Sequence, residues 1–155
     1  PGAGTTFKVY LPRFAAKAGP SGKEEPHAES LSGRETILLV EDEEPILHMT
    51  VEMLRRLEYN VLPASTPGEA ISIARDYNGQ IDLLLTDVIM PEMNGRDLAK
   101  NLLALYPDLK RLYMSGYTAD VIAHHGVLDE GVYFIQKPFN KQTLSAKLRE
   151  TIEGS

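Results

Sequence analysis

The sequence predicts an α/β fold in which a single parallel sheet is covered by helices on both faces. Short apolar runs of strand length alternate along the chain with segments whose apolar residues recur at helical spacing. This alternation is typical of βαβ units, whose right-handed crossovers produce a doubly wound sheet. In addition, three of the apolar runs are followed within two residues by a charged residue, at the edge where open sheets of this kind hold their ligands.

Composition limits the class of protein further. The 155 residues suffice for one well-buried domain, and 43% hydrophobic with 25% charged residues is typical of a soluble globular protein. The net charge of −6 argues against nucleic-acid binding. There is no cysteine, which excludes disulfides and thiolate metal sites and agrees with a reducing cytoplasm. No apolar run approaches the roughly 20 residues of a membrane helix, so we expect a cytoplasmic segment without membrane contact.

The N-terminal third differs in character from the rest. Thr6 to Leu11 alternates and is rich in β-formers, which predicts a strand, although no partner strand is near in sequence. Residues 14–35 are rich in Gly, Pro, Ser, Ala and charges without apolar period, as in a flexible linker. On composition alone, an ordinary flexible tail is the alternative interpretation.

The first three elements of the predicted domain begin at residue 36. A strand over Thr36–Val40 precedes a helix over Glu44–Glu58, with Pro45 in its tolerated first turn and Asn60 as a left-handed cap. A short strand over 61–64 follows. The predicted inner face of the helix consists of Ile46, Thr50, Met53, Leu54 and Leu57.

The central elements carry clear start and stop signals. Thr66-Pro67-Gly68-Glu69 has the pattern of a capping box with Pro at the first helical position. A buried strand over Ile81–Thr86 ends before Asp87, and a helix over Arg96–Tyr106 is stopped by Pro107. The helix that begins at the capping box Thr66–Glu69 has an apolar stripe, which consists of Ala70, Ile73, Ala74 and Tyr77.

The last elements complete the sheet. Strands are predicted over Leu109–Ser115 and Val132–Gln136, and a final helix over Lys141–Ile152 follows Asn140 as its cap. Between these strands Thr118–Leu128 predicts only a short or frayed fourth helix, because Gly126 interrupts the pattern early. In the final helix, over Lys141–Ile152, the residues predicted to point inward are Leu144, Leu148 and Ile152. The elements together predict a flavodoxin-like (βα)5 doubly wound five-stranded parallel sheet of order 2-1-3-4-5.

Charged side chains meet at the carboxyl edge of this predicted sheet. Glu41 and Asp42 follow the first strand, and Asp87 follows the third. Three carboxylates so close raise one another's pKa unless a cation neutralises them, and oxygen-only ligands suit Mg2+. Lys137, after the fifth strand, suits a phosphoryl oxygen or Asp87 itself, and Ser115 supplies a hydroxyl. The set predicts phosphoryl transfer onto Asp87 through an acyl phosphate.

Each of these residues also has an ordinary interpretation. A lone Asp after a strand is commonly a turn residue, an acidic helix start is favoured by the helix dipole, and Lys137 before Pro138 is compatible with a surface lysine. The functional interpretation rests on their joint occurrence at three strand ends.

Four motifs give the chain a family resemblance. They are Leu39-Val40-Glu41-Asp42-Glu43, Leu85-Thr86-Asp87-Val88-Ile89-Met90-Pro91 with Asn94-Gly95, Met114-Ser115-Gly116-Tyr117, and Gln136-Lys137-Pro138-Phe139. In this order and spacing, residues 36–153 resemble the receiver domain of two-component response regulators. We assign residues 36–155 to this domain.

The resemblance implies a role for each site residue. Asp87 is implied as phosphoacceptor, Asp42 as a direct Mg2+ ligand and Glu41 as a ligand through water. The Ile89 backbone carbonyl is implied as a further metal ligand, and Ser115 as a partner of a phosphoryl oxygen. The remaining implied roles are Phe134 as the switch aromatic, Lys137 as the partner of the phosphoryl group, and a cis peptide bond between Lys137 and Pro138.

The chain departs from the family pattern in three places. Glu41 stands where Asp is commoner, Phe134 lacks the hydroxyl of a switch Tyr, and the weak fourth helix leaves the output partner open. We also hypothesise that Ile89 and Tyr117, which flank Asp87 and Ser115, obstruct the attacking water and slow dephosphorylation.

A second resemblance concerns the N-terminus. Gly2-Ala3-Gly4-Thr5-Thr6-Phe7, with Val9-Tyr10-Leu11-Pro12, is similar to the closing segment of a histidine-kinase ATP-binding domain. It implies that residues 1–13 are a remnant of that domain's final strand, and that the receiver is the C-terminal one of a bacterial hybrid sensor histidine kinase. The segment itself would lack ATP-dependent kinase activity. Implied partners are the kinase core or a His-containing phosphotransfer domain, and a weak homodimer is left open.

Two other functions compete with this interpretation. An Asp-nucleophile phosphatase would need a second acid two residues after Asp87, where Ile89 stands. A phosphorylation-independent docking module would not need the complete set of site residues.

Overall fold

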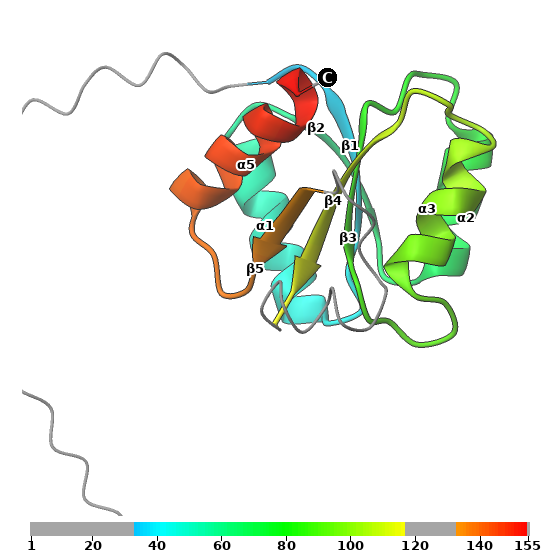
Figure 1. The fold of residues 1–155 in the computed structure, drawn as a ribbon, viewed down its shortest axis with the longest axis horizontal. Coiled ribbons are helices and arrows are strands. Elements are labelled where there is room, and N and C mark those ends of the chain that lie inside the picture. Colours follow the sequence, from blue (N-terminus) through cyan, green and yellow to red (C-terminus); the bar gives the residue numbers. More distant parts are fainter. Residues whose placement is uncertain (1–32, 117–132, 155) are drawn as a thin grey trace, which may run out of the picture.

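A five-stranded parallel sheet between two helical layers forms the domain in the computed structural model (Figure 1), which describes residues 33–116 and 133–154. The strands are β1 (Thr36–Val40), β2 (Asn60–Ala64), β3 (Leu83–Asp87), β4 (Lys110–Ser115) and β5 (Tyr133–Gln136). The helices are α1 (Glu44–Arg55), α2 (Pro67–Asp76), α3 (Gly95–Leu103) and α5 (Lys141–Glu153). The strand order β2-β1-β3-β4-β5 confirms the predicted doubly wound topology.

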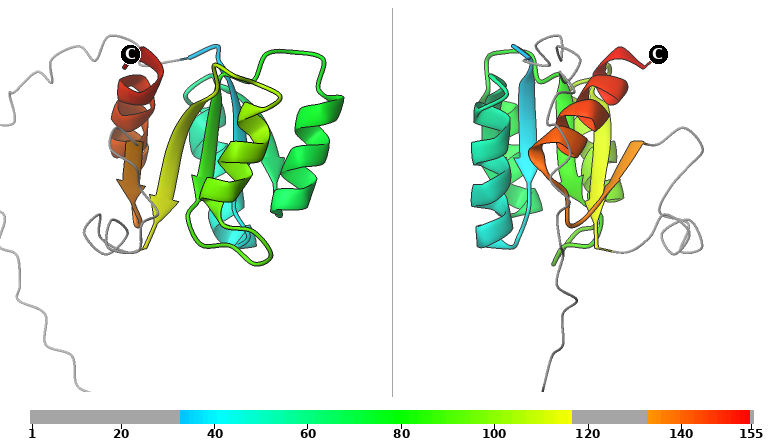
Figure 2. Two further views of the ribbon diagram at one scale, coloured as in Figure 1. Left: turned by 45° about the vertical axis from the view of Figure 1, so that its right-hand side comes forward. Right: turned by 90° about the vertical axis from the view of Figure 1, so that its left-hand side faces the viewer.

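The two faces of the sheet are covered by different helix pairs. Helices α1 and α5 lie on one face, and α2 and α3 on the other (Figures 1 and 2). Leu38 and Val40 of β1 pack in the cluster that includes residues of α2 and α3, whereas Ile37 and Leu39 pack in the cluster that includes residues of α1 and α5. The continuous apolar sequence of β1 is explained by burial on both sides.

The end of α1 differs from the prediction. The helix stops at Arg55 rather than Glu58, and Asn60 is the first residue of β2 instead of a cap. The left-handed residue is Glu58, with φ of 66°. Its amide donates to the Arg55 carbonyl, and the Tyr59 amide donates to Leu54, which together form a Schellman motif. The prediction was wrong because tertiary packing of Tyr59 and Leu54 on the sheet outweighed the intrinsic preference of Asn for this conformation.

Two further local predictions were right only in part. Leu47 and Val51 take the buried positions of α1 that were predicted for Ile46 and Met53, since adjacent apolar residues leave the helix rotation open until it packs. At α2, Thr66 caps the Glu69 amide as predicted, at 3.1 Å. The Glu69 carboxylate, however, accepts hydrogen bonds from Ser65, so the second half of the capping box is replaced by a bond one residue earlier.

Several predictions fall outside the described residues. These are the strand at Thr6–Leu11, the linker up to residue 32, the fourth helix at Thr118–Leu128, Tyr117 and Val132. In the described part of the chain, no helix is both long and apolar enough to span a membrane.

Candidate functional site

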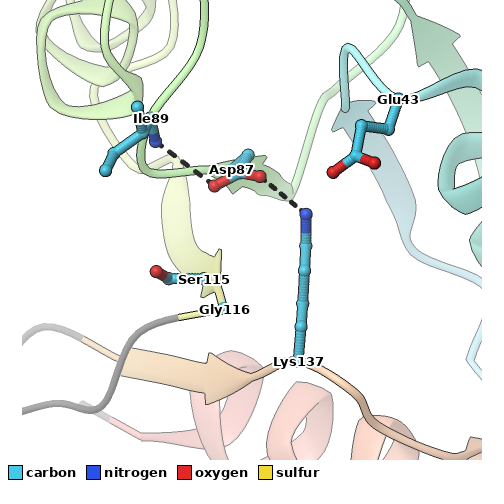
Figure 3. Close-up of a pocket in the computed structure, with 6 residues that line it drawn as sticks. All are labelled: Glu43, Asp87, Ile89, Ser115, Gly116 and Lys137. Carbon is cyan, nitrogen blue, oxygen red and sulfur yellow. Dashed lines mark hydrogen bonds and ion pairs between the residues drawn. The ribbon is translucent and has the colours of Figure 1, made fainter. Parts of the chain in front are cut away.

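The carboxyl edge of the sheet brings the predicted site residues together. The parallel register pairs Val40 with Thr86, so the residues after β1 lie beside the end of β3. Asp87 is the last residue of β3, Ser115 ends β4, and Lys137 directly follows β5. A pocket of about 410 Å³ opens there (Figure 3), lined by Glu43, Asp87, Ile89, Ser115, Gly116 and Lys137. Glu43 and Gly116 belong to the quoted motifs but were not predicted as site residues.

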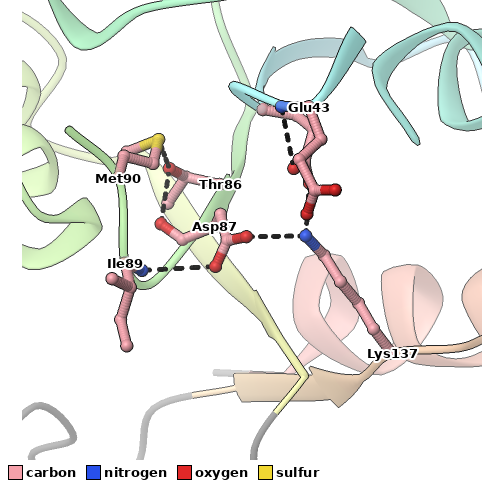
Figure 4. Close-up of polar contacts among 7 residues, drawn as sticks. Glu43, Thr86, Asp87, Ile89, Met90 and Lys137 are labelled. Carbon is pink, nitrogen blue, oxygen red and sulfur yellow. Dashed lines mark hydrogen bonds and ion pairs between the residues drawn. The ribbon is translucent and has the colours of Figure 1, made fainter. Parts of the chain in front are cut away.

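Lys137 joins two strand ends through a pair of short ionic contacts. Its Nζ lies 2.6 Å from Asp87 Oδ2 and 2.6 Å from Glu41 Oε2. The Glu41 side chain is fully buried, and those of Asp87 and Lys137 are only 13% and 12% exposed. The bond from Lys137 to Asp87 is visible in Figure 4. Because these side chains are little exposed, the contacts hold the Asp87 carboxylate in one orientation more firmly than surface ion pairs would.

Burial and charge shift the pKa values of two of these groups. Burial raises the pKa of Glu41, and the adjacent negative charge of Asp87 acts in the same direction, while the hydrogen bond and charge of Lys137 counteract only part of the rise. For Lys137, burial alone would lower the pKa, but hydrogen bonds and charges from Asp87 and Glu41 outweigh it, so the pKa is raised. Lys137 therefore stays protonated at neutral pH.

The predicted metal ligands converge at the same edge. Glu41, Asp42 and Asp87 each offer a carboxylate oxygen, and these oxygens lie within 4.8 Å of one another. With all groups charged, the cluster holds three carboxylates, and the ammonium of Lys137 contacts two of them, Glu41 and Asp87, which leaves an excess of negative charge. A set of hard oxygen donors with uncompensated negative charge fits Mg2+.

The loop after Asp87 is fixed by main-chain contacts. The Ile89 amide donates to Asp87 Oδ1 at 3.2 Å, and the Val88 amide donates to the Met114 carbonyl at 3.0 Å. Gly95, at the start of α3, passes so close to the Asp87 carbonyl that a Cβ would overlap it. Glycine is therefore needed at this position. The Ile89 side chain is 62% exposed and borders the pocket, while its implied role as a carbonyl ligand remains a prediction.

The remaining predicted residues lie on β4 and β5. Ser115 is 1% exposed, and its carbonyl accepts a hydrogen bond from the Lys137 amide at 2.8 Å. Phe134 is half-buried, is paired with Tyr113 in the sheet, and packs on the α2–α3 side. The Lys137–Pro138 peptide bond is cis, as the resemblance implied.

Comparison with known proteins identifies the family of the chain. A family model described as the response regulator receiver domain matches residues 37–149. Sensor kinase CckA of Brucella abortus (strain 2308) is 36% identical over 159 residues, which cover 98% of this chain and 17% of that protein. Response regulator receiver protein CpdR of the same organism is 28% identical over 116 residues, covering 75% of this chain and 95% of that protein. A crystal structure of the receiver domain from hybrid histidine kinase CckA covers 76% of this chain and 98% of its own, with 33% identity and a TM-score of 0.64.

Proposed function

The chain belongs to the response regulator receiver domain family of two-component systems, and from this we propose that Asp87 is its phosphoacceptor. The observation that carries the proposal is the Asp87 carboxylate at the end of β3, open to the pocket and held on one oxygen by Lys137 and on the other by the Ile89 amide. A carboxylate fixed in this way is oriented for attack on an incoming phosphorus atom.

In the proposed reaction, an Asp87 oxygen attacks the phosphorus of a phosphohistidine. The new O–P bond forms an acyl phosphate, while the P–N bond breaks and its electrons remain with the imidazole, which then takes up a proton. Lys137 would pair with the transferred group, and the Ser115 hydroxyl would donate to one of its oxygens. Mg2+, held by Asp42, Asp87 and, through water, Glu41, with the Ile89 carbonyl as a further ligand, would neutralise phosphoryl charge.

We further propose that repacking around Ser115 and Phe134 transmits the phosphorylated state to a signalling surface. Phe134 is suited to this because it is half-buried and is paired with Tyr113 of β4, the strand that ends at Ser115. Without a hydroxyl, its position would be governed by packing alone.

We propose that this receiver is part of a hybrid sensor histidine kinase. It would lie in the cytoplasmic part of that protein. The similarity to CckA over 98% of the chain supports this, including the assignment of residues 1–13 to a kinase domain and of 14–35 to a linker. The chain spans only 17% of that relative's length. The partners would be the kinase core or a His-containing phosphotransfer domain, with no nucleic acid, and a weak homodimer is compatible with the fold.

Intact-mass measurement tests the phosphoacceptor directly. The protein is incubated with phosphoramidate, with and without Mg2+, as wild type, Asp87→Asn and Asp82→Asn. Asp82 precedes the same strand at its other end, where it accepts a hydrogen bond from the Thr36 amide at 2.7 Å. We expect one Mg2+-dependent phosphoryl adduct in wild type and Asp82→Asn, and none in Asp87→Asn. An adduct that survives Asp87→Asn would refute the assignment.

A further inference from the structure

Thr86, the residue before the proposed phosphoacceptor, has a hydroxyl that takes no part in the proposed reaction. Its side chain is fully buried. The Oγ1 donates to the main-chain carbonyl of Asp87 at 3.0 Å and lies 3.8 Å from Met90 Sδ (Figure 4). One hydroxyl thus contacts both the start of the β3–α3 loop and a side chain four residues further on.

The Asp87 carbonyl, which accepts the hydrogen bond from Thr86, also lies in close contact with the start of α3. It faces Gly95 at the first turn of α3, at a distance that leaves no room even for a Cβ. The Thr86 methyl group borders the same spot, since a Cβ on Gly95 would lie 3.0 Å from Thr86 Cγ2. Buried carbonyls are almost always hydrogen-bonded, and losing a donor leaves the group poorly solvated. Removal of the hydroxyl should therefore make the peptide plane after Asp87 less well fixed.

The orientation of this peptide plane bears on the carboxylate itself. The loop that starts at the Asp87 carbonyl returns the Ile89 amide to Asp87 Oδ1 at 3.2 Å. Met90, which the Thr86 hydroxyl also contacts, follows Ile89 directly and is 7% exposed. Thr86 thus contacts the loop on both sides of the amide that orients the acceptor oxygen.

We propose that Thr86 is a positioning residue for phosphorylation. Its hydroxyl fixes the Asp87 main chain and Met90, so that the Ile89 amide and Lys137 present the Asp87 carboxylate to the phosphodonor. The inference rests on the proposed function, in that it presupposes Asp87 as the acceptor. Thr86 acts through its neighbours, because its hydroxyl donates to the Asp87 main chain and contacts the Met90 sulfur.

The test compares substitutions that separate the hydroxyl from the methyl group. Thr86→Val keeps the shape and removes the hydroxyl, whereas Thr86→Ser keeps the hydroxyl. Thr50→Val is the matched control, because Thr50 is fully buried in α1 and its hydroxyl has no hydrogen-bond partner among the described residues. With phosphoramidate and Mg2+, we expect Thr86→Val to phosphorylate about tenfold more slowly than wild type, as is typical for loss of an orienting contact. Thr86→Ser and Thr50→Val should stay close to wild type.

A second measurement tests the positioning role of Thr86 without relying on phosphorylation of Asp87. In proton–nitrogen NMR spectra without phosphodonor, the Ile89 amide resonance should shift in Thr86→Val and return toward wild type in Thr86→Ser. If wild type forms no phosphoryl adduct but the Ile89 amide resonance shifts in Thr86→Val and returns in Thr86→Ser, the proposed function is refuted. The effect of the Thr86 hydroxyl on the Ile89 amide is then still supported. If Thr86→Val phosphorylates at the wild-type rate, or if its Ile89 amide is unchanged, the inference is overturned. Should Thr86→Val not fold, the Thr86→Ser and Thr86→Ala pair gives the same comparison, and equal rates in this pair refute the inference.

Discussion

Glu35 and Glu41 flank the same strand, β1, and the contrast between them separates the structural end of the domain from its functional end. At the amino end, Arg149 of α5 binds Glu35 through two hydrogen bonds of 3.0 and 3.2 Å and lies 5.5 Å from the centre of the Tyr59 ring. At the carboxyl end, Lys137 contacts Glu41 and Asp87, both at 2.6 Å. At each end, a cation far along the chain from β1 binds a carboxylate beside β1. Arg149 links α5 to the amino end of β1, and Lys137 links the end of β5 to the carboxyl end of β1.

The two ends differ in charge balance. The guanidinium of Arg149 faces one partly buried carboxylate, with the exposed Glu153 at 4.0 Å. The ammonium of Lys137 contacts two carboxylates, one of them fully buried, in a cluster that also contains Asp42. A balanced bidentate pair holds the fold together, whereas an excess of negative charge costs stability and is typical of a site that binds a cation. The comparison implies that substitutions at the two ends should separate stability from phosphorylation.

The largest effect is expected when each cation is replaced by methionine. Lys137→Met leaves the buried carboxylate of Glu41 without its cation, so the free energy of unfolding without Mg2+ should fall by about 3 kcal/mol. The phosphorylation rate should fall about a hundredfold, because a cation that stabilises phosphoryl charge is lost. Arg149→Met should cost about 1–2 kcal/mol, since water can reach Glu35, whose side chain is 26% exposed.

Urea unfolding and intact-mass kinetics on the same samples check this pair. Arg149→Met should phosphorylate at the wild-type rate under conditions in which it is folded. A comparable loss of rate in both variants would contradict the division of the molecule into a structural and a functional end.

Mg2+ should stabilise the protein through the carboxyl end alone. At a free concentration of about 100 times the dissociation constant, binding to the native state adds about 2.7 kcal/mol to the free energy of unfolding. Glu35→Gln should keep this gain, whereas Asp42→Asn and Asp87→Asn should lose most of it. Thermal unfolding with and without Mg2+ provides the measurement, and an equal gain in Asp42→Asn would exclude the predicted ligand set.

The raised pKa of Glu41 predicts a specific pH dependence in Mg2+-free buffer. Burial lifts this pKa above the ordinary value of 4.5, so between the two values the native state binds more protons than the unfolded state. The contribution of Glu41 to stability is therefore fully present below pH 4.5 and is lost as the pH rises through the raised value. The difference in unfolding free energy between wild type and Glu41→Gln should fall across this window. A difference that grows with pH would show that the pairing with Lys137 outweighs burial.

The sequence was sufficient for the sheet and for most of the site because these depend on local signals. Short continuous apolar runs such as Leu83–Leu85, with turn residues after them, favour buried strands, and the βαβ order then places Asp42, Asp87 and Lys137 at one edge. The specific role of each site residue, such as phosphoacceptor or metal ligand, was inferred from the family resemblance. Composition and spacing alone left the ordinary interpretations of these residues open.

What the sequence could not supply depends on tertiary contacts. The double contact of Lys137 with Glu41 and Asp87 requires the distances between strand ends, and the left-handed Glu58 arises from packing of Tyr59. The hydroxyl of Thr86 gave no signal because a threonine at the end of a strand is ordinary by β propensity, and its role is indicated by its contacts with the Asp87 carbonyl and Met90 in the folded structure.

The smallest expected effect concerns exposed apolar side chains at the two ends. Ile89, 62% exposed, borders the pocket, whereas Leu105, 45% exposed, follows the far end of α3. If Ile89 obstructs the water that hydrolyses the acyl phosphate, Ile89→Ser should shorten the phosphoryl lifetime severalfold, because the aspartyl phosphate becomes accessible from the solvent side. Leu105→Ser removes a comparable apolar group away from the site and should leave the lifetime unchanged. The decay of the phosphoryl adduct, followed by intact mass after removal of the phosphodonor, distinguishes the two variants. Equal decay in wild type and Ile89→Ser would show that Ile89 does not restrict access of water to Asp87, and would leave Tyr117 as the residue of that pair to substitute next.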